Sequence, residues 1–151
     1  MEPSRLRALL DDVRSGKTST QSALEELKRL PFQKVGDVAT IDRHRHVRQG
    51  FPEVVLGEGK TAEQIAAILT ELATGGANLL ATRVAPEKAE SVCRMVSGAR
   101  YEREARAILV EQKPTVRVGI GTVLVVSAGT SDMSVAEEAV VTARAMGNDV
   151  E

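Results

Sequence analysis

Two short amphipathic segments open the chain. In residues 4–15 the apolar side chains recur at the spacing of one helix face, with Ser4 as an N-cap and Gly16 as the end. Residues 20–29 repeat this pattern, and Pro31 stops the segment because proline cannot continue a helix. The two segments predict a small helical hairpin at the start of the chain.

The middle of the chain alternates between strand-like and helical patterns. Residues 38–41 and 53–56 are short runs of the composition typical of strands. Thr61-Ala62-Glu63-Gln64 then has the pattern of a capping box, in which the first and last side chains satisfy each other's backbone N–H groups. Apolar residues follow at helical spacing until Gly75-Gly76, so a helix is predicted between these signals.

The same alternation continues to residue 110. Residues 78–83 predict a strand, and Pro86 suits the first turn of a helix that ends at Gly98. Residues 101–110 alternate apolar with charged side chains, which favours a strand over a helix. The order strand, helix, strand, helix, strand between residues 53 and 110 predicts a small α/β domain.

A different pattern begins after Lys113-Pro114-Thr115, which we interpret as a linker. Residues 122–126 are a continuous apolar run, typical of a strand buried on both faces of a parallel sheet. A turn, a helix from Val135 to Met146 and the strand-like residues 149–151 follow. The residues expected on the inner face of that helix are Ala136, Ala139, Val140 and Ala143.

These patterns predict an α/β protein with two domains. Residues 1–113 form an accessory α/β domain with the leading helical hairpin. Residues 114–151 form the first β-α unit, and the start of a second strand, of a flavodoxin-like parallel sheet that is incomplete.

The amino-acid composition argues against some kinds of binding partner. Only 2% of the residues are aromatic and the net charge is −1, so both the stacking rings and the basic surface of a nucleic-acid binder are absent. The chain has a single cysteine, an amphipathic rather than an apolar N-terminus, and no apolar run of the ~20 residues that span a bilayer. We therefore expect a cytoplasmic protein with no nucleic-acid or membrane partner.

The turn Gly129-Thr130-Ser131-Asp132 is the best candidate for a binding site. It joins a predicted strand to a helix N-terminus, where free backbone N–H groups and the helix dipole favour an anion. Thr130 and Ser131 can donate hydroxyls to a phosphate, and Asp132 can accept from a ribose hydroxyl. On spacing alone, the plainer interpretation is favoured, in which Ser131 and Asp132 only cap the helix.

Two cationic residues are weaker candidates. Lys60 lies in Gly57-Glu58-Gly59-Lys60-Thr61, which has glycines as in a phosphate loop but lacks the full Walker spacing. It could still contact a phosphate held by a neighbouring subunit. Arg83 follows a predicted strand and is either a ligand contact or the partner of Glu53 or Glu87 in an ion pair.

The histidines and the cysteine have plain interpretations. His44 and His46 lie near Asp42, but no third ligand accompanies them, so a solvated surface or a partner contact is favoured and no metal site is predicted. Cys93 has apolar neighbours at helical spacing and is expected in the core.

Four short motifs, in order along the chain, carry a resemblance to a known family. They are Arg48-Gln49-Gly50-Phe51-Pro52-Glu53-Val54-Val55, Gly59-Lys60-Thr61, Leu80-Ala81-Thr82-Arg83 and Ala128-Gly129-Thr130-Ser131-Asp132. The chain resembles the AIR-carboxylase-like family of carboxylase/hydrolases that make the pyridinium precursor of the nickel-pincer cofactor. The resemblance runs from about Arg5 to the last residue.

The resemblance implies a specific activity for the complete enzyme. Such an enzyme carboxylates the pyridinium ring of nicotinic acid adenine dinucleotide with CO2 or bicarbonate and hydrolyses the phosphoanhydride to release AMP. A cysteine thiolate that adds to the ring is expected as the nucleophile, but at a position beyond Glu151. We therefore expect no catalytic residue in this chain and no activity from the chain alone.

The resemblance also bears on partners and cofactors. It implies nucleotide contacts from Gly129, Thr130, Ser131 and Asp132, and a homo-oligomer formed through the parallel-sheet domain. No cofactor is certain, although Mg2+ is compatible with the anhydride step.

Two other functions are compatible with the sequence. One is an AIR carboxylase or mutase of purine synthesis, against which the extra N-terminal domain and the Ala-Gly-Thr-Ser-Asp spelling speak. The other is a non-catalytic module in which residues 1–113 serve oligomerisation or binding.

Overall fold

The helices at the start of the chain are those that the apolar spacing predicts. In the computed structural model, α1 (Pro3–Arg14) and α2 (Thr20–Lys28) bury Leu9 and Ala23. The backbone N–H of Ser22 donates to Ser19 Oγ at 3.0 Å at the start of α2. The antiparallel hairpin of β1 (Phe32–Val35) and β2 (Ala39–Asp42) follows, and the sequence predicted only its second strand.

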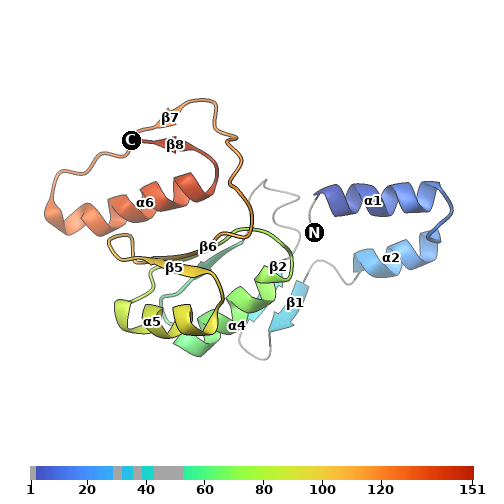
Figure 1. Cartoon of the computed structure of the whole chain (residues 1–151), viewed down its shortest axis with the longest axis horizontal. Coiled ribbons are helices and arrows are strands. Elements are labelled where there is room, and N and C mark those ends of the chain that lie inside the picture. Colours follow the sequence, from blue (N-terminus) through green and yellow to red (C-terminus); the bar gives the residue numbers. More distant parts are fainter. Residues whose placement is uncertain (1–2, 29–31, 36–38, 43–52) are drawn as a thin grey trace. The chain divides into compact units, whose positions relative to one another are not determined.

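The structure describes residues 3–28, 32–35, 39–42 and 53–151. They belong to two compact units, residues 1–53 and 54–151, which are described separately (Figure 1). His44, His46 and most of the first family motif, residues 48–52, lie outside the described residues. The division after residue 113 stays a prediction.

The second unit is built on a mixed sheet of four strands in the order β3-β4-β6-β5. Strand β3 (Val54–Leu56) runs parallel to β4 (Leu79–Thr82), and α4 (Ala62–Ala73) connects them. Helix α5 (Pro86–Met95) leads from β4 to the antiparallel strands β5 (Ala99–Glu102) and β6 (Ala107–Val110). The small α/β domain is thus confirmed, but residues 101–110 form parts of two strands rather than one.

The reason for the extra strand is a tight turn at Arg103–Arg106. The N–H of Arg106 donates to the carbonyl of Arg103 at 3.2 Å, and Arg106 has a left-handed backbone with φ of 49°. This four-residue turn reverses the chain direction, which the alternation of apolar and charged residues does not reveal.

The start of α4 follows the predicted capping box. The N–H of Gln64 donates to Thr61 Oγ1 at 3.2 Å, and the N–H of Thr61 donates to Gln64 Oε1 at 3.0 Å. Two N–H groups that the helix cannot satisfy internally thus gain partners, which fixes the first turn.

One face of the sheet packs against α4 and α5. Side chains on a strand alternate between the two faces, so Leu79 and Ala81 lie together with their partners Val110 and Ile108. The largest fully buried side chains, Ile65, Leu69, Val84, Val92 and Ile108, come from these strands, the two helices and the loop after β4. Full burial of such a side chain contributes about 1.5–3 kcal/mol.

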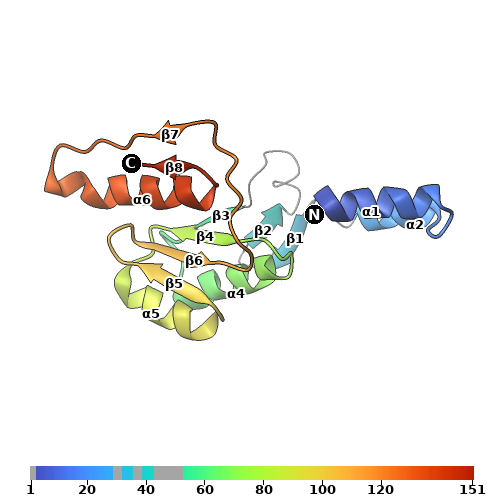
Figure 2. The same cartoon turned by 45° about the horizontal axis from the view of Figure 1, so that its top comes forward.

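The opposite face is covered by α6 (Met133–Ala145). Val141 and Ala145 of this helix pack against a buried cluster of Leu80, Ala105 and Ala107. Figure 2 shows the sheet between the pair α4 and α5 on one side and α6 on the other. The predicted inner face of α6 is therefore partly wrong, since Ala139 is exposed and the residues on the sheet are Val141 and Ala145.

Helix α6 also connects two parallel strands, β7 (Thr122–Val123) and β8 (Asp149–Val150). The pairing extends through Val125 N–H to Glu151 O at 2.8 Å and Glu151 N–H to Val123 O at 3.0 Å. The predicted β-α unit and second strand are thus present. The predicted burial of the first strand is wrong, because Leu124 and Val126 are 70% and 80% exposed. Among the described residues β7 pairs with β8 alone.

Candidate functional site

The candidate turn lies between β7 and α6, directly before the helix. Gly129 precedes a short 3-10 helix, η1 (Thr130–Asp132), which leads directly into α6. All four residues of the turn are exposed. The carboxyl ends of parallel strands are the edge at which ligands bind in α/β folds, and the turn follows the carboxyl end of β7.

Neither Ser131 nor Asp132 caps the helix with its side chain. Gly129 stands at the N-cap position of η1 and Asp132 at that of α6, and no side-chain cap hydrogen bond is present at either. The only side-chain contact between them is from Ser131 Oγ to Asp132 Oδ1 at 3.3 Å. The capping interpretation therefore has no hydrogen bond to support it, and both side chains face solvent, where they can take part in binding.

Gly129 has no conformational need to be glycine. Its φ of −144° is extended, and a Cβ added there would come no closer than 3.6 Å to Ser131 Oγ. What a glycine offers at this point is an open backbone that a phosphate can approach closely. The arrangement can hold an anion through the N–H groups and hydroxyls of the helix start, and a hydroxyl through Asp132. The binding role of these four residues stays a prediction.

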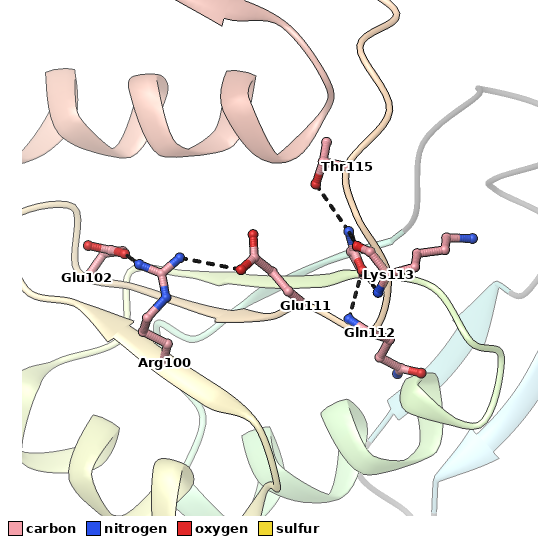
Figure 3. Close-up of polar contacts among 7 residues, drawn as sticks. Arg100, Glu102, Glu111, Gln112, Lys113 and Thr115 are labelled. Atoms are coloured by element: carbon pink, nitrogen blue, oxygen red, sulfur yellow. Dashed lines mark hydrogen bonds and ion pairs between the residues drawn. The ribbon is translucent and has the colours of Figure 1, made fainter.

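The segment that leads to β7 is fastened to the start of β4. Asn78 Nδ2 donates to the carbonyl of Lys113 at 2.8 Å and to Thr115 Oγ1 at 3.2 Å. Asn78 Oδ1 accepts from the N–H groups of Gln112 and Lys113 at 2.9 and 3.0 Å. Figure 3 shows Lys113 and Thr115 of this linker and, away from them, the Arg100 side chain between Glu102 and Glu111. The predicted linker is thus held by one side chain that no sequence pattern had indicated.

Lys60 takes part in the loop between β3 and α4. Its Nζ donates to the carbonyl of Leu56 at 2.8 Å, and Lys88 Nζ donates to the carbonyl of Lys60 at 2.8 Å. These bonds give Lys60 a structural use at the end of β3. Its contact with a phosphate of another subunit stays a prediction.

Arg83 makes ion pairs rather than standing free. Its Nη1 lies 3.4 Å from Glu58 Oε2, and its Nε lies 3.7 Å from Glu138 Oε1. Arg83 thus forms ion pairs, but with partners other than the predicted Glu53 or Glu87, and its role as a ligand contact stays a prediction. The sequence could not have indicated Glu138, because the pair forms only when α6 folds back over the sheet.

Cys93 lies on α5 and is partly rather than fully buried. Burial raises the pKa of its thiol above the ordinary value. A nucleophilic thiolate needs a lowered pKa, so this environment does not favour a reactive cysteine.

Metal and membrane sites are also constrained by the structure. Across the described ranges, no three side chains of His, Cys, Asp or Glu gather in a way that could hold a metal ion. No helix in the part of the chain that the structure describes combines the length and apolarity needed to cross a membrane.

Two comparisons relate the chain to known proteins. Residues 32–113 match the family described as LarB/PurE-like N-terminal domain. The chain is also similar to the uncharacterized protein MJ0165 of Methanocaldococcus jannaschii, with 31% identity over 147 residues. That alignment covers 94% of this chain and 57% of the relative, so the chain spans little more than half the relative's length.

Proposed function

Because this chain belongs to the family of LarB/PurE-like N-terminal domains, we propose that it is part of a carboxylase that acts on nicotinic acid adenine dinucleotide. Membership of this family supports a carboxylase-type enzyme. The four family motifs, which end in Ala128-Gly129-Thr130-Ser131-Asp132, support the narrower choice of substrate.

The proposed reaction has two parts. A cysteine thiolate of the complete enzyme adds to the pyridinium ring, and the resulting enamine carbon at C5 attacks CO2 to form a carbon–carbon bond. Loss of the C5 proton and departure of the thiolate then restore the aromatic ring. In the second part, water cleaves the phosphoanhydride, which releases AMP and leaves the carboxylated mononucleotide.

The part of this chain in the reaction is to hold the nucleotide. One observation carries this proposal: Ser131 and Asp132 are exposed at the start of a 13-residue helix, and neither makes a side-chain capping hydrogen bond. Ser131 and the adjacent N–H groups would bind a phosphate, and Asp132 would accept from a ribose hydroxyl or contact a substituent of the ring.

Cys93 is not the proposed nucleophile. It is partly buried on α5, a helix that packs on the face of the mixed sheet opposite to α6. Burial raises the pKa of its thiol, so less thiolate is present at neutral pH than for an exposed cysteine.

A titration tests the binding role. The chain is titrated with nicotinic acid adenine dinucleotide while the amide signals of Gly129–Asp132 are followed by NMR. We expect shifts confined to this turn and its neighbours. Asp132→Ala should weaken the affinity about tenfold, since a lost hydrogen bond to a polar ligand group is worth ~1–3 kcal/mol, and should change the melting temperature little.

The same titration separates the alternatives. Unchanged affinity together with a lowered melting temperature in Asp132→Ala would make the residue a structural cap. Equal or tighter binding of 5-aminoimidazole ribonucleotide would favour an AIR carboxylase or mutase. Binding of neither nucleotide would favour a non-catalytic module.

A further inference from the structure

Arg83 has a backbone conformation that suits glycine better than arginine. Its φ is 52°, in the left-handed region. The backbone on both sides is fixed, because Thr82 O accepts from the N–H of Gly57 and the N–H of Val84 donates to Arg106 O, each at 2.8 Å. A non-glycine residue held in this region is strained, which draws attention to what the Arg83 side chain contacts.

The side chain joins three separate elements. The guanidinium lies at the end of β4 and reaches Glu58 in the β3–α4 loop and Glu138 on α6. The Glu138 side chain is only 25% exposed, so this pair is less screened by solvent than an ordinary surface pair. Within the described residues, it is the ion pair that connects the mixed sheet with α6.

Helix α6 is thereby held at two points along one face. Glu138, Val141 and Ala145 follow one another at spacings of three and four, which places them on the same stripe. Val141 and Ala145 provide the apolar contact with the sheet, and Glu138 provides the ionic contact nearer the helix start. Asp132 precedes Glu138 by six residues (138 − 132), which is about 9 Å along a helix axis.

We propose that Arg83 is a positioning residue that fixes the first half of α6, and with it the turn Gly129–Asp132, against the mixed sheet. The Arg83–Glu138 ion pair forms without a ligand, but its role in nucleotide binding rests on the proposed function. Without the ion pair, α6 keeps its apolar contact at Val141 and Ala145 while its N-terminal half moves more freely. The turn is then less ordered when it meets a phosphate.

The chain offers a matched control for the test. Arg106 is the other non-glycine residue with a left-handed backbone, at φ 49°, and it makes no ion pair among the described residues. Arg83→Gly and Arg106→Gly both relieve backbone strain, but only the first removes the contact with α6. Glu138→Gln removes the same contact from the other side without changing the backbone.

The measurements are amide hydrogen exchange, melting temperature and affinity for nicotinic acid adenine dinucleotide on the 151-residue chain. We expect exchange across residues 130–138 to become about threefold faster or more in Arg83→Gly and Glu138→Gln, as the loss of such a pair allows. Affinity should fall by a similar factor, whereas melting should stay within about 2 °C for Arg83→Gly. Arg106→Gly should leave exchange and affinity as in the parent chain.

Two further arms separate an ion pair from a general structural effect. Glu138→Gln should not accelerate exchange further in the Arg83→Gly background, because both substitutions remove the same ion pair. The difference between Arg83→Gly and the parent should shrink in about 1 M salt, where the Debye length is only ~3 Å.

The proposal is overturned if exchange across residues 130–138 is the same in Arg83→Gly as in the parent. It is equally overturned if Arg106→Gly accelerates exchange as much, because strain relief would then be the cause. A parent chain that binds no dinucleotide contradicts the proposed function, whereas the exchange measurement still decides the role of Arg83.

Discussion

Asn78 and Lys113 are joined by a pair of hydrogen bonds in which one side chain satisfies both backbone groups of the other residue. Asn78 Nδ2 donates to the Lys113 carbonyl at 2.8 Å, and Asn78 Oδ1 accepts from the Lys113 N–H at 3.0 Å. A strand start and the linker that leads to β7 are thus fixed to each other, although 35 positions separate them.

Asn78→Ala should therefore destabilise the second unit. The substitution leaves backbone groups of the linker without their partner, and each net hydrogen bond contributes about 0.5–1.5 kcal/mol. We expect a loss of about 1–3 kcal/mol in the free energy of unfolding, measured by urea denaturation.

Two variants serve as controls for Asn78→Ala. Thr115→Val removes only the 3.2 Å bond from Asn78 Nδ2 and should cost the least. Asn78→Asp keeps an acceptor for the N–H groups but loses both donors, so it should be intermediate. Equal stability in all three variants and the parent chain would show that the linker is not held by Asn78.

A carboxyl in the first turn of α4 makes the stability of the chain depend on pH. The pKa of the Glu63 carboxyl is lowered, first by a hydrogen bond from its own backbone N–H and then by one from the Thr61 hydroxyl. A lowered folded pKa contributes stability that is present above the ordinary pKa of glutamate and is lost as the pH falls through the folded value. Glu63→Gln should remove this part of the acid dependence of unfolding.

Thr61→Ala should raise the pKa of Glu63 toward its ordinary value, as followed by NMR titration of the carboxyl. It should also lower the stability by about 1 kcal/mol, because the cap itself is lost. Thr61→Ser keeps the hydroxyl and should preserve both properties. A Glu63 pKa that is identical in the three proteins would contradict this account of the shift.

Substitution by alanine should lower the stability at Gly57 but not at Gly129. A Cβ at Gly57 would lie 2.7 Å from Val84 Cγ2 and 3.0 Å from the carbonyl of Thr82, so Gly57→Ala should destabilise by about 1–3 kcal/mol. A Cβ at Gly129 meets nothing closer than 3.6 Å, so Gly129→Ala should melt like the parent chain. If the turn binds a phosphate, Gly129→Ala should nevertheless weaken dinucleotide affinity. Gly121→Ala, with open space around the Cβ, should change neither property.

Cys93 should react slowly with thiol reagents. Burial raises its pKa, and the thiolate is the reactive form, so its alkylation near pH 8 should be several-fold slower in the folded chain than in urea. Cys93→Ser should leave dinucleotide affinity unchanged. Rapid alkylation in the folded state, or loss of affinity in Cys93→Ser, would return this residue to consideration as a functional thiol.

The sequence predicted most helices because their signals are local. The apolar spacing of α1 and α2 and the capping box of α4 each depend on residues that are neighbours in the chain. The division of residues 101–110 into two strands escaped prediction, because it depends on one left-handed residue, Arg106, in an otherwise alternating pattern.

Burial was harder to predict than secondary structure. The apolar run at 122–126 has the composition of a strand with two covered faces, yet Val126 is 80% exposed, because coverage depends on which segments pack above it. The predicted site likewise combines features that local sequence reveals with contacts that it does not. The turn at 129–132 was found from its residue types, whereas Glu138 and Asn78 act across long separations that no local pattern reports.

The position of α6 between a parallel strand pair and the mixed sheet has a consequence for the order in which the chain folds. Every strand pair of the mixed sheet lies between Val54 and Val110, so this sheet can form while the rest of the chain is still being synthesised. Strand β7 can pair with β8 only after the whole crossover exists, since parallel strands need a long connection. We therefore expect Val141 and Ala145 to pack on the finished mixed sheet first. The sheet then acts as a template on which β7 and β8 pair later.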